Sequence, residues 1–91
     1  MNIFDDEDDF LVGHPRDKYY EVAKTANVNI VEMELDKMLR RLAVAEKMLE
    51  ERGLDQEYEM LIKASVIDTD IDNRTNSIYI ELVGNIVTQC E

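Results

Sequence analysis

The sequence predicts a mainly α-helical protein, a small helical bundle built on one long central helix. Three observations support this fold class. The apolar residues of the central segment recur at alternating spacings of four and three, the segment contains no internal proline or glycine, and a glycine follows it at position 53. Such spacing places apolar side chains in one stripe along a helix that faces another helix. We therefore expect helix packing to be the dominant feature of this chain.

The chain begins with an acidic segment, and we predict that residues 1–15 are a disordered tail ahead of a single helical domain, 16–91. Five acids follow one another without interruption, and like charges in a row repel each other and extend a chain. The segment can alternatively act as a docking peptide, in which apolar residues enter a groove while the acids meet a basic rim. The candidate partner-binding residues are Phe4, Asp5, Asp6, Glu7, Asp8, Asp9, Phe10 and Leu11.

Two helices are predicted next, a short one over 16–26 and the long one over about 30–52. We expect Asn29 to be the N-cap of the long helix, with Glu32 three residues later. Gly53 suits the left-handed conformation that follows many helix C-termini. The stripe either packs inside the chain or serves self-association or the binding of another protein. It consists of Val31, Leu35, Met38, Leu42, Ala45 and Leu49.

The rest of the chain is predicted to hold a second, antiparallel helix and a segment of two possible structures. The second helix covers about 55–67 after a very short turn, with Asp55 as its expected N-cap. Residues 68–77 have the composition of a polar loop. Residues 78–90 are compatible with a helix or with a β-hairpin that turns at Gly84-Asn85, and we favour the helix.

The charge of the chain limits its partners. Twenty-one acids oppose ten bases, for a net charge of −11. Repulsion disfavours direct binding of nucleic acid and of anionic membranes, whereas another protein with a basic surface is a natural partner. The charge also permits an alternative function, a nucleic-acid mimic that blocks a DNA- or RNA-binding protein. Residues 30–52 are nearly neutral, however, and a phosphate-like array needs a continuous negative face.

Residues for catalysis or for a cofactor are lacking, and we expect a protein without enzymatic activity. The one histidine, His14, falls in the predicted tail, and no base is placed to activate Cys90. Asp68, Asp70 and Asp72 alternate as in the first half of an EF-hand calcium loop. The glycine and the bidentate glutamate that such a loop requires are both absent from their positions. We therefore expect a solvated turn there and no metal site.

These patterns together predict a protein–protein interaction module, such as an adaptor, an assembly factor or an inhibitor. No apolar run approaches the ~18 residues of a membrane span, and the N-terminus is acidic where a secretory signal is basic. A single cysteine permits no internal disulfide, which fits a reducing compartment. We expect a cytoplasmic location, in the host cytoplasm if the protein is viral.

Overall fold

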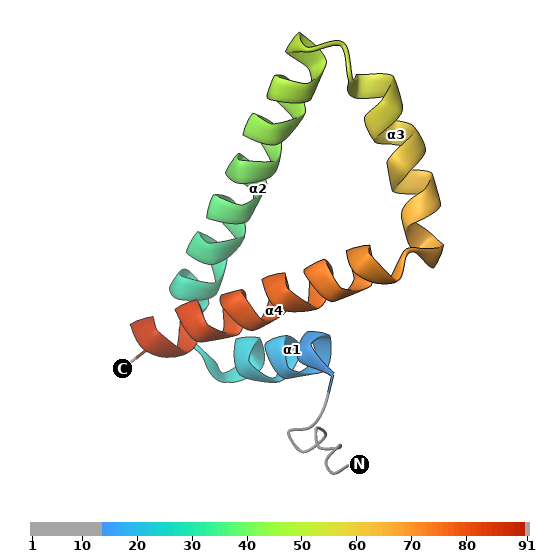
Figure 1. Ribbon diagram of the computed structural model, residues 1–91. Coiled ribbons are helices and arrows are strands. Elements are labelled where there is room, and N and C mark those ends of the chain that lie inside the picture. Colours follow the sequence, from blue (N-terminus) through green and yellow to red (C-terminus); the bar gives the residue numbers. More distant parts are fainter. Residues whose placement is uncertain (1–13, 91) are drawn as a thin grey trace.

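A computed structural model of the protein describes residues 14–90, and these residues confirm the mainly α-helical fold class. The described part of the chain contains four α-helices, one 3-10 turn and no strand. The elements are α1 (Pro15–Thr25), α2 (Val28–Glu51), α3 (Asp55–Ala64), η1 (Ser65–Ile67) and α4 (Thr69–Gln89). Figure 1 shows that α2, α3 and α4 form the sides of a triangle and that α1 lies along α4.

Helix α1 confirms the predicted short helix but begins within the segment that we assigned to the tail. Pro15 is the first helical residue, a position where a missing backbone N–H is tolerated because it would have no partner within the helix. His14 is the N-cap, and its Nδ1 atom accepts a hydrogen bond from the backbone N–H of Arg16 at 3.2 Å. His14 and Pro15 therefore belong to the helical domain.

Helix α2 is the predicted long helix, and its C-terminus has the expected form. Gly53 has a φ of 71°, and the backbone N–H of Leu54 donates to the carbonyl of Leu49 at 2.8 Å, the hydrogen bond of a Schellman motif. The predicted N-cap was wrong by two residues. Asn27 is the cap, because its side chain accepts from the backbone N–H of Asn29 at 2.8 Å.

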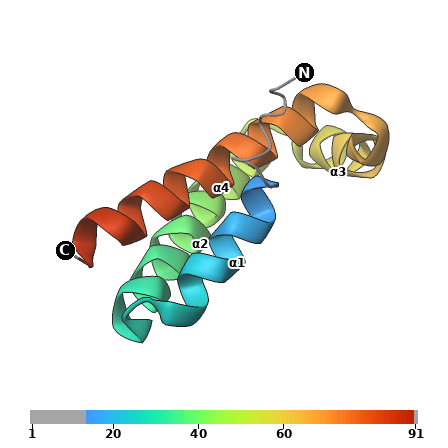
Figure 2. The ribbon, with the colours of Figure 1, turned by 90° about the horizontal axis from the view of Figure 1, so that it is seen from below.

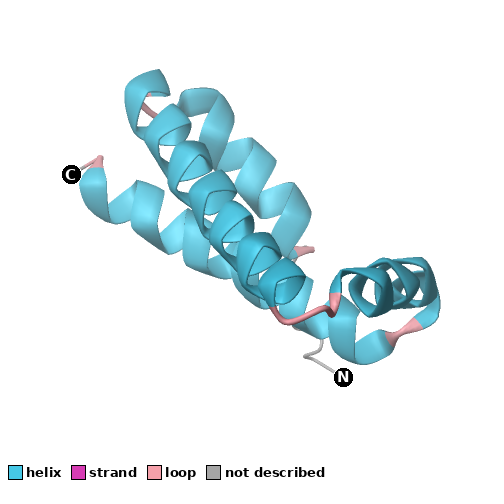
Figure 3. Cartoon of the chain, turned by 90° about the horizontal axis from the view of Figure 1, so that it is seen from above, coloured by secondary structure: helices cyan, strands magenta, loops and turns pink. Residues whose placement is uncertain are grey.

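Helix α3 and η1 cover the predicted second helix, and α3 runs back from the turn in roughly the opposite direction to α2 and diverges from it (Figure 1). Asp55 is not the N-cap: it lies in the first turn of α3, where its charge complements the helix dipole, and Leu54 holds the cap position without a side-chain bond. No residue of α3 is buried. Figure 3 shows α3 set apart from the three packed helices.

The C-terminal part of the chain is helical from Thr69 onward, so the predicted polar loop over 68–77 was wrong and the β-hairpin does not form. Asp68 is the N-cap, and its Oδ1 accepts from the backbone N–H groups of Asp70 and Ile71 at 2.9 and 3.3 Å. Arg74 Nε then reaches Asp70 at 3.0 Å, one turn away. A strong cap and this i,i+4 pair offset the low helix propensity of the polar residues.

The core lies where α1, α4 and the beginning of α2 meet, and it is small (Figure 2). Ile86 is the only buried hydrophobic residue among residues 14–90. The ring centroids of Tyr19 and Tyr79 are 5.8 Å apart and join α1 to α4. The radius of gyration is 16.0 Å, compared with about 12 Å for a compact domain of this length. The fold is therefore flat and open, with principal extents of 43 × 36 × 15 Å.

Candidate interaction surface

The stripe of α2 is only partly covered by the rest of the chain. Val31 and Met38 are half-buried near the corner with α4, and Leu49 is half-buried near the turn to α3. Leu35 and Leu42 are 53% and 45% exposed. The stripe is therefore covered at some positions and exposed at others, because the triangle brings neighbours to α2 only at its corners (Figure 1).

Exposed leucines of α2 lie on the side of the helix that turns toward α3. Leu35, Leu39 and Leu42 share one face by their spacing, and Glu46, one turn beyond Leu42, lines an open cleft of about 740 Å³ between α2 and α3. Tyr58 of α3 lines the same cleft.

Helix α3 adds two apolar side chains that follow Tyr58 by three and four residues. Leu61 and Ile62 share the face of Tyr58 and are 61% and 45% exposed. We call the combined surface of the two arms the open apolar face. It consists of Leu35, Leu39, Leu42, Leu61 and Ile62.

The corner between α3 and α4 is also apolar and uncovered. Val66 and Ile67 are 80% and 86% exposed. Monomeric soluble proteins seldom expose large apolar side chains over so much of their surface, and extended patches of this kind mark interaction sites.

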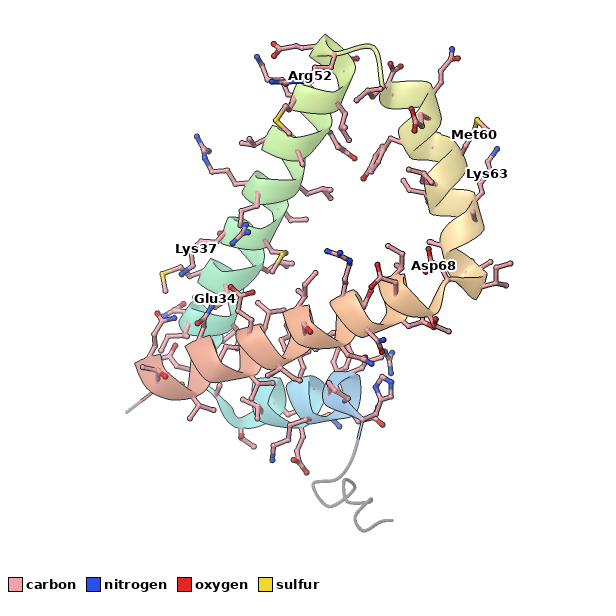
Figure 4. All side chains as sticks on the ribbon, in the orientation of Figure 1. Glu34, Lys37, Arg52, Met60, Lys63 and Asp68 are labelled. Atoms are coloured by element: carbon pink, nitrogen blue, oxygen red, sulfur yellow. The ribbon has the colours of Figure 1, made fainter. Side chains whose placement is uncertain are left out.

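A buried carboxylate joins α2 to α4 beside the open apolar face. Glu34 is 3% exposed, and its carboxylate accepts from Gln89 Nε2 at 2.8 Å, from Asn85 Nδ2 at 3.2 Å and from Lys37 Nζ at 2.7 Å. The Lys37 hydrogen bond lowers the pKa of Glu34, although burial alone would raise it. Figure 4 shows Glu34 and Lys37 at the end of α2 that adjoins α4. The arrangement fixes the angle of this corner.

The burial of Glu34 was not predicted from the sequence, although the chain holds a signal for it. Asn85 and Gln89 are four residues apart and share a helix face with Ile86, which is the core residue of α4. Two amides on an otherwise apolar face call for a buried acceptor, because unpaired buried polar groups are costly.

A different face of α2 carries a cluster of bases beside apolar side chains, which we call the basic patch. Its residues line a shallow depression of about 580 Å³. Arg40 and Arg41 make no ion pair with another described residue. Val44 follows Leu42 by two residues, which turns it away from the open apolar face. The basic patch consists of Lys37, Arg40, Arg41, Val44, Ala45 and Met48.

The remaining predicted sites are dispersed or lie outside the described residues. Asp68 caps α4 and Asp70 pairs with Arg74, so these aspartates have roles within the helix. Within residues 14–90, no three acidic, histidine or cysteine side chains gather in a way that could hold a metal ion. The acidic docking candidates, residues 4–11, fall outside the described part of the chain. None of the described helices has the length and apolar composition to cross a membrane.

The fold and surface of the described residues define a small, mainly α-helical protein with a small core and a large exposed apolar surface. Residues 10–91 match the model of a protein family described as a domain of unknown function (DUF2018). Because the match covers most of the chain, the chain belongs to this family. No curated protein and no solved structure matches the sequence.

Proposed function

We propose that this protein is a non-enzymatic interaction module that packs its open apolar face against another helical surface, that of a second copy or of a different protein. The observation that supports this most directly is the exposure of Leu35, Leu39 and Leu42 along the middle of α2. Their spacing is the one that helices use to pack against each other. Burying what remains exposed of each leucine contributes about 1 kcal/mol.

The weakness of the intramolecular core supports the same proposal. Helix α3 buries none of its side chains, and Ile86 is the one buried hydrophobic residue of the described chain. A small domain needs a sizeable core or a partner to offset the entropy lost on folding. The open apolar face supplies the missing area when a partner covers it.

The alternative proposal, a nucleic-acid mimic, has less support. Mimicry needs a continuous negative face, and the bases Lys37, Arg40 and Arg41 interrupt the longest helix. Competition between the protein and DNA for a DNA-binding target would favour mimicry, whereas simultaneous binding of both would exclude it.

The main proposal is tested by changing one residue of the open apolar face and one of the opposite face. Leu42→Asp and Val44→Asp introduce the same charge on the same helix, at positions 45% and 63% exposed. We expect sedimentation to show an assembly of wild-type protein with itself, or with a partner recovered from the native cells. Leu42→Asp abolishes this assembly and retains the helical circular dichroism spectrum, whereas Val44→Asp leaves the assembly intact.

The proposal fails if the wild-type protein remains a monomer at all concentrations and recovers no partner. It also fails if Leu42→Asp assembles as the wild-type protein does, or if both variants lose assembly equally. In the last case the loss reflects added charge and not the open apolar face.

A further inference from the structure

We propose that the basic patch on α2 is the docking site of the chain's own acidic N-terminal segment, Phe4 to Leu11. The patch combines two features that this segment matches. It is lined by the bases Arg40 and Arg41 and by the apolar residues Val44, Ala45 and Met48.

Charge complementarity is the first argument. The segment contains five consecutive acids, residues 5–9, in a chain whose net charge is −11. In such a chain a cluster of three bases is the natural target for an acidic run. Lys37 already contacts Glu34 at 2.7 Å, so Arg40 and Arg41 carry most of the uncompensated charge. Neither forms an ion pair with another described residue.

The apolar parts of both surfaces are the second argument. Phe4 and Phe10 stand on either side of the acidic run. Met48 and Val44 are 47% and 63% exposed. A phenylalanine ring that docks on these residues would contact the sulfur of Met48, a favourable sulfur–aromatic interaction, and would lie next to a guanidinium group.

The dimensions agree with this match. Six residue steps separate the two rings, a distance of about 20 Å for an extended chain. The basic patch runs from residue 37 to residue 48, which is about 17 Å along a helix. The acidic run with its two flanking rings is therefore about as long as the patch.

The position of α1 places the segment within reach of its own copy's patch. His14 precedes α1, and the end of α1 meets the beginning of α2 at a corner, from which α1 lies along α4 and α2 forms another side of the triangle (Figures 1 and 2). The path from His14 along α1 and then to the middle of α2 is at most about 40 Å, and the direct line is shorter. The nine residue steps from Asp5 to His14 span up to about 30 Å. A tethered segment also has an effective concentration in the millimolar range, so a weak contact suffices for docking.

The test uses the full chain and compares two methionines. The single cysteine, Cys90, is replaced by serine, and a nitroxide is attached through Asn2→Cys. The Met48 and Met60 methyl signals are recorded by NMR with the nitroxide oxidised and reduced. Met48 lies in the basic patch, whereas Met60 is 70% exposed on α3. We expect the oxidised label to remove most of the Met48 signal and to leave the Met60 signal.

Further controls identify the interaction. Arg40→Gln with Arg41→Gln restores the Met48 signal, and so does 1 M salt, where the Debye length is about 3 Å. Val44→Asp restores the signal as well, while Leu42→Asp does not, so this contact and the open apolar face are tested separately. A mixture of spin-labelled copies and isotope-labelled untagged copies reports only contacts between chains.

Equal losses at Met48 and Met60, or no loss at either, would overturn the proposal. A loss at Met48 that persists without the two arginines would overturn it too. Loss of the Met48 signal in the mixed sample to the same extent as in the tagged chain would mean that the segment docks on another copy, which also contradicts the proposal.

Discussion

Glu34 offers a sharp test of how the corner between α2 and α4 is held. Its carboxylate is 3% exposed and accepts hydrogen bonds from two amides of α4, at 2.8 and 3.2 Å. In Glu34→Gln one carboxylate oxygen becomes an NH2 group, so a donor faces a donor and the charge is lost. Hydrogen bonds to a charged group contribute about 1.5–3 kcal/mol and neutral ones about 0.5–1.5 kcal/mol. We expect the free energy of unfolding to fall by about 2 kcal/mol at neutral pH.

Urea denaturation followed by far-ultraviolet circular dichroism measures this change. All variants are compared at one protein concentration, because association adds to apparent stability. The matched control is Glu32→Gln, which removes the same charge from an exposed position of the same helix. The control is expected to change the free energy of unfolding by less than about 0.5 kcal/mol.

The lowered pKa of Glu34 adds a pH dependence to the same experiment. A carboxyl whose pKa is lower in the folded than in the unfolded state stabilises the fold above its unfolded value, here 4.5. This stabilisation is lost as the pH falls through the lower folded pKa. The difference in free energy of unfolding between wild-type protein and Glu34→Gln should therefore be largest at neutral pH and should shrink as the pH falls below 4.5. A difference that is independent of pH, or an equal loss in Glu32→Gln, would refute the reasoning.

Two further substitutions test the core and the N-terminus of α4. Ile86→Ala is expected to lower the free energy of unfolding by about 2–5 kcal/mol, because it leaves a cavity at the centre of the core. Ile80→Ala, at a position that is 60% exposed, should have a much smaller effect in the same urea titration. Asp68→Ala removes the acceptor of two backbone N–H groups and should lower the free energy of unfolding by about 1 kcal/mol. Asp72→Ala removes the same charge from a position that does not cap the helix, and equal losses from both variants would contradict the capping role of Asp68.

The sequence was informative where local signals act alone. The apolar period and Gly53 predicted the body and the end of α2, because a left-handed residue after a helix depends on few distant contacts. The location of α1 followed in the same way, although its Pro15 was read as the end of a tail. A proline is equally compatible with the segment before a helix and with the first turn of the helix. Only the N-cap at His14 shows that Pro15 lies in the first turn.

Prediction failed where structure depends on remote or competing groups. The polar residues after Asp68 favour turns in isolation, but the cap and the Asp70–Arg74 pair keep them helical. From the sequence alone Glu34 is indistinguishable from an exposed acid, since its partners Asn85 and Gln89 are more than fifty residues away. The exposure of Leu35 and Leu42 could not be predicted, because periodicity indicates that a face is apolar and not what covers it.

The attachment of α3 at only two corners divides the molecule into parts of unequal persistence. Local opening of α3 would leave the buried contacts of Ile86 and Glu34 intact, since α3 contributes no buried side chain. Amide protons of α3 should then exchange with solvent through local opening, well before those of α4 near Ile86. A single melting temperature would describe the unfolding of the corner around Ile86 and would not report the local opening of α3.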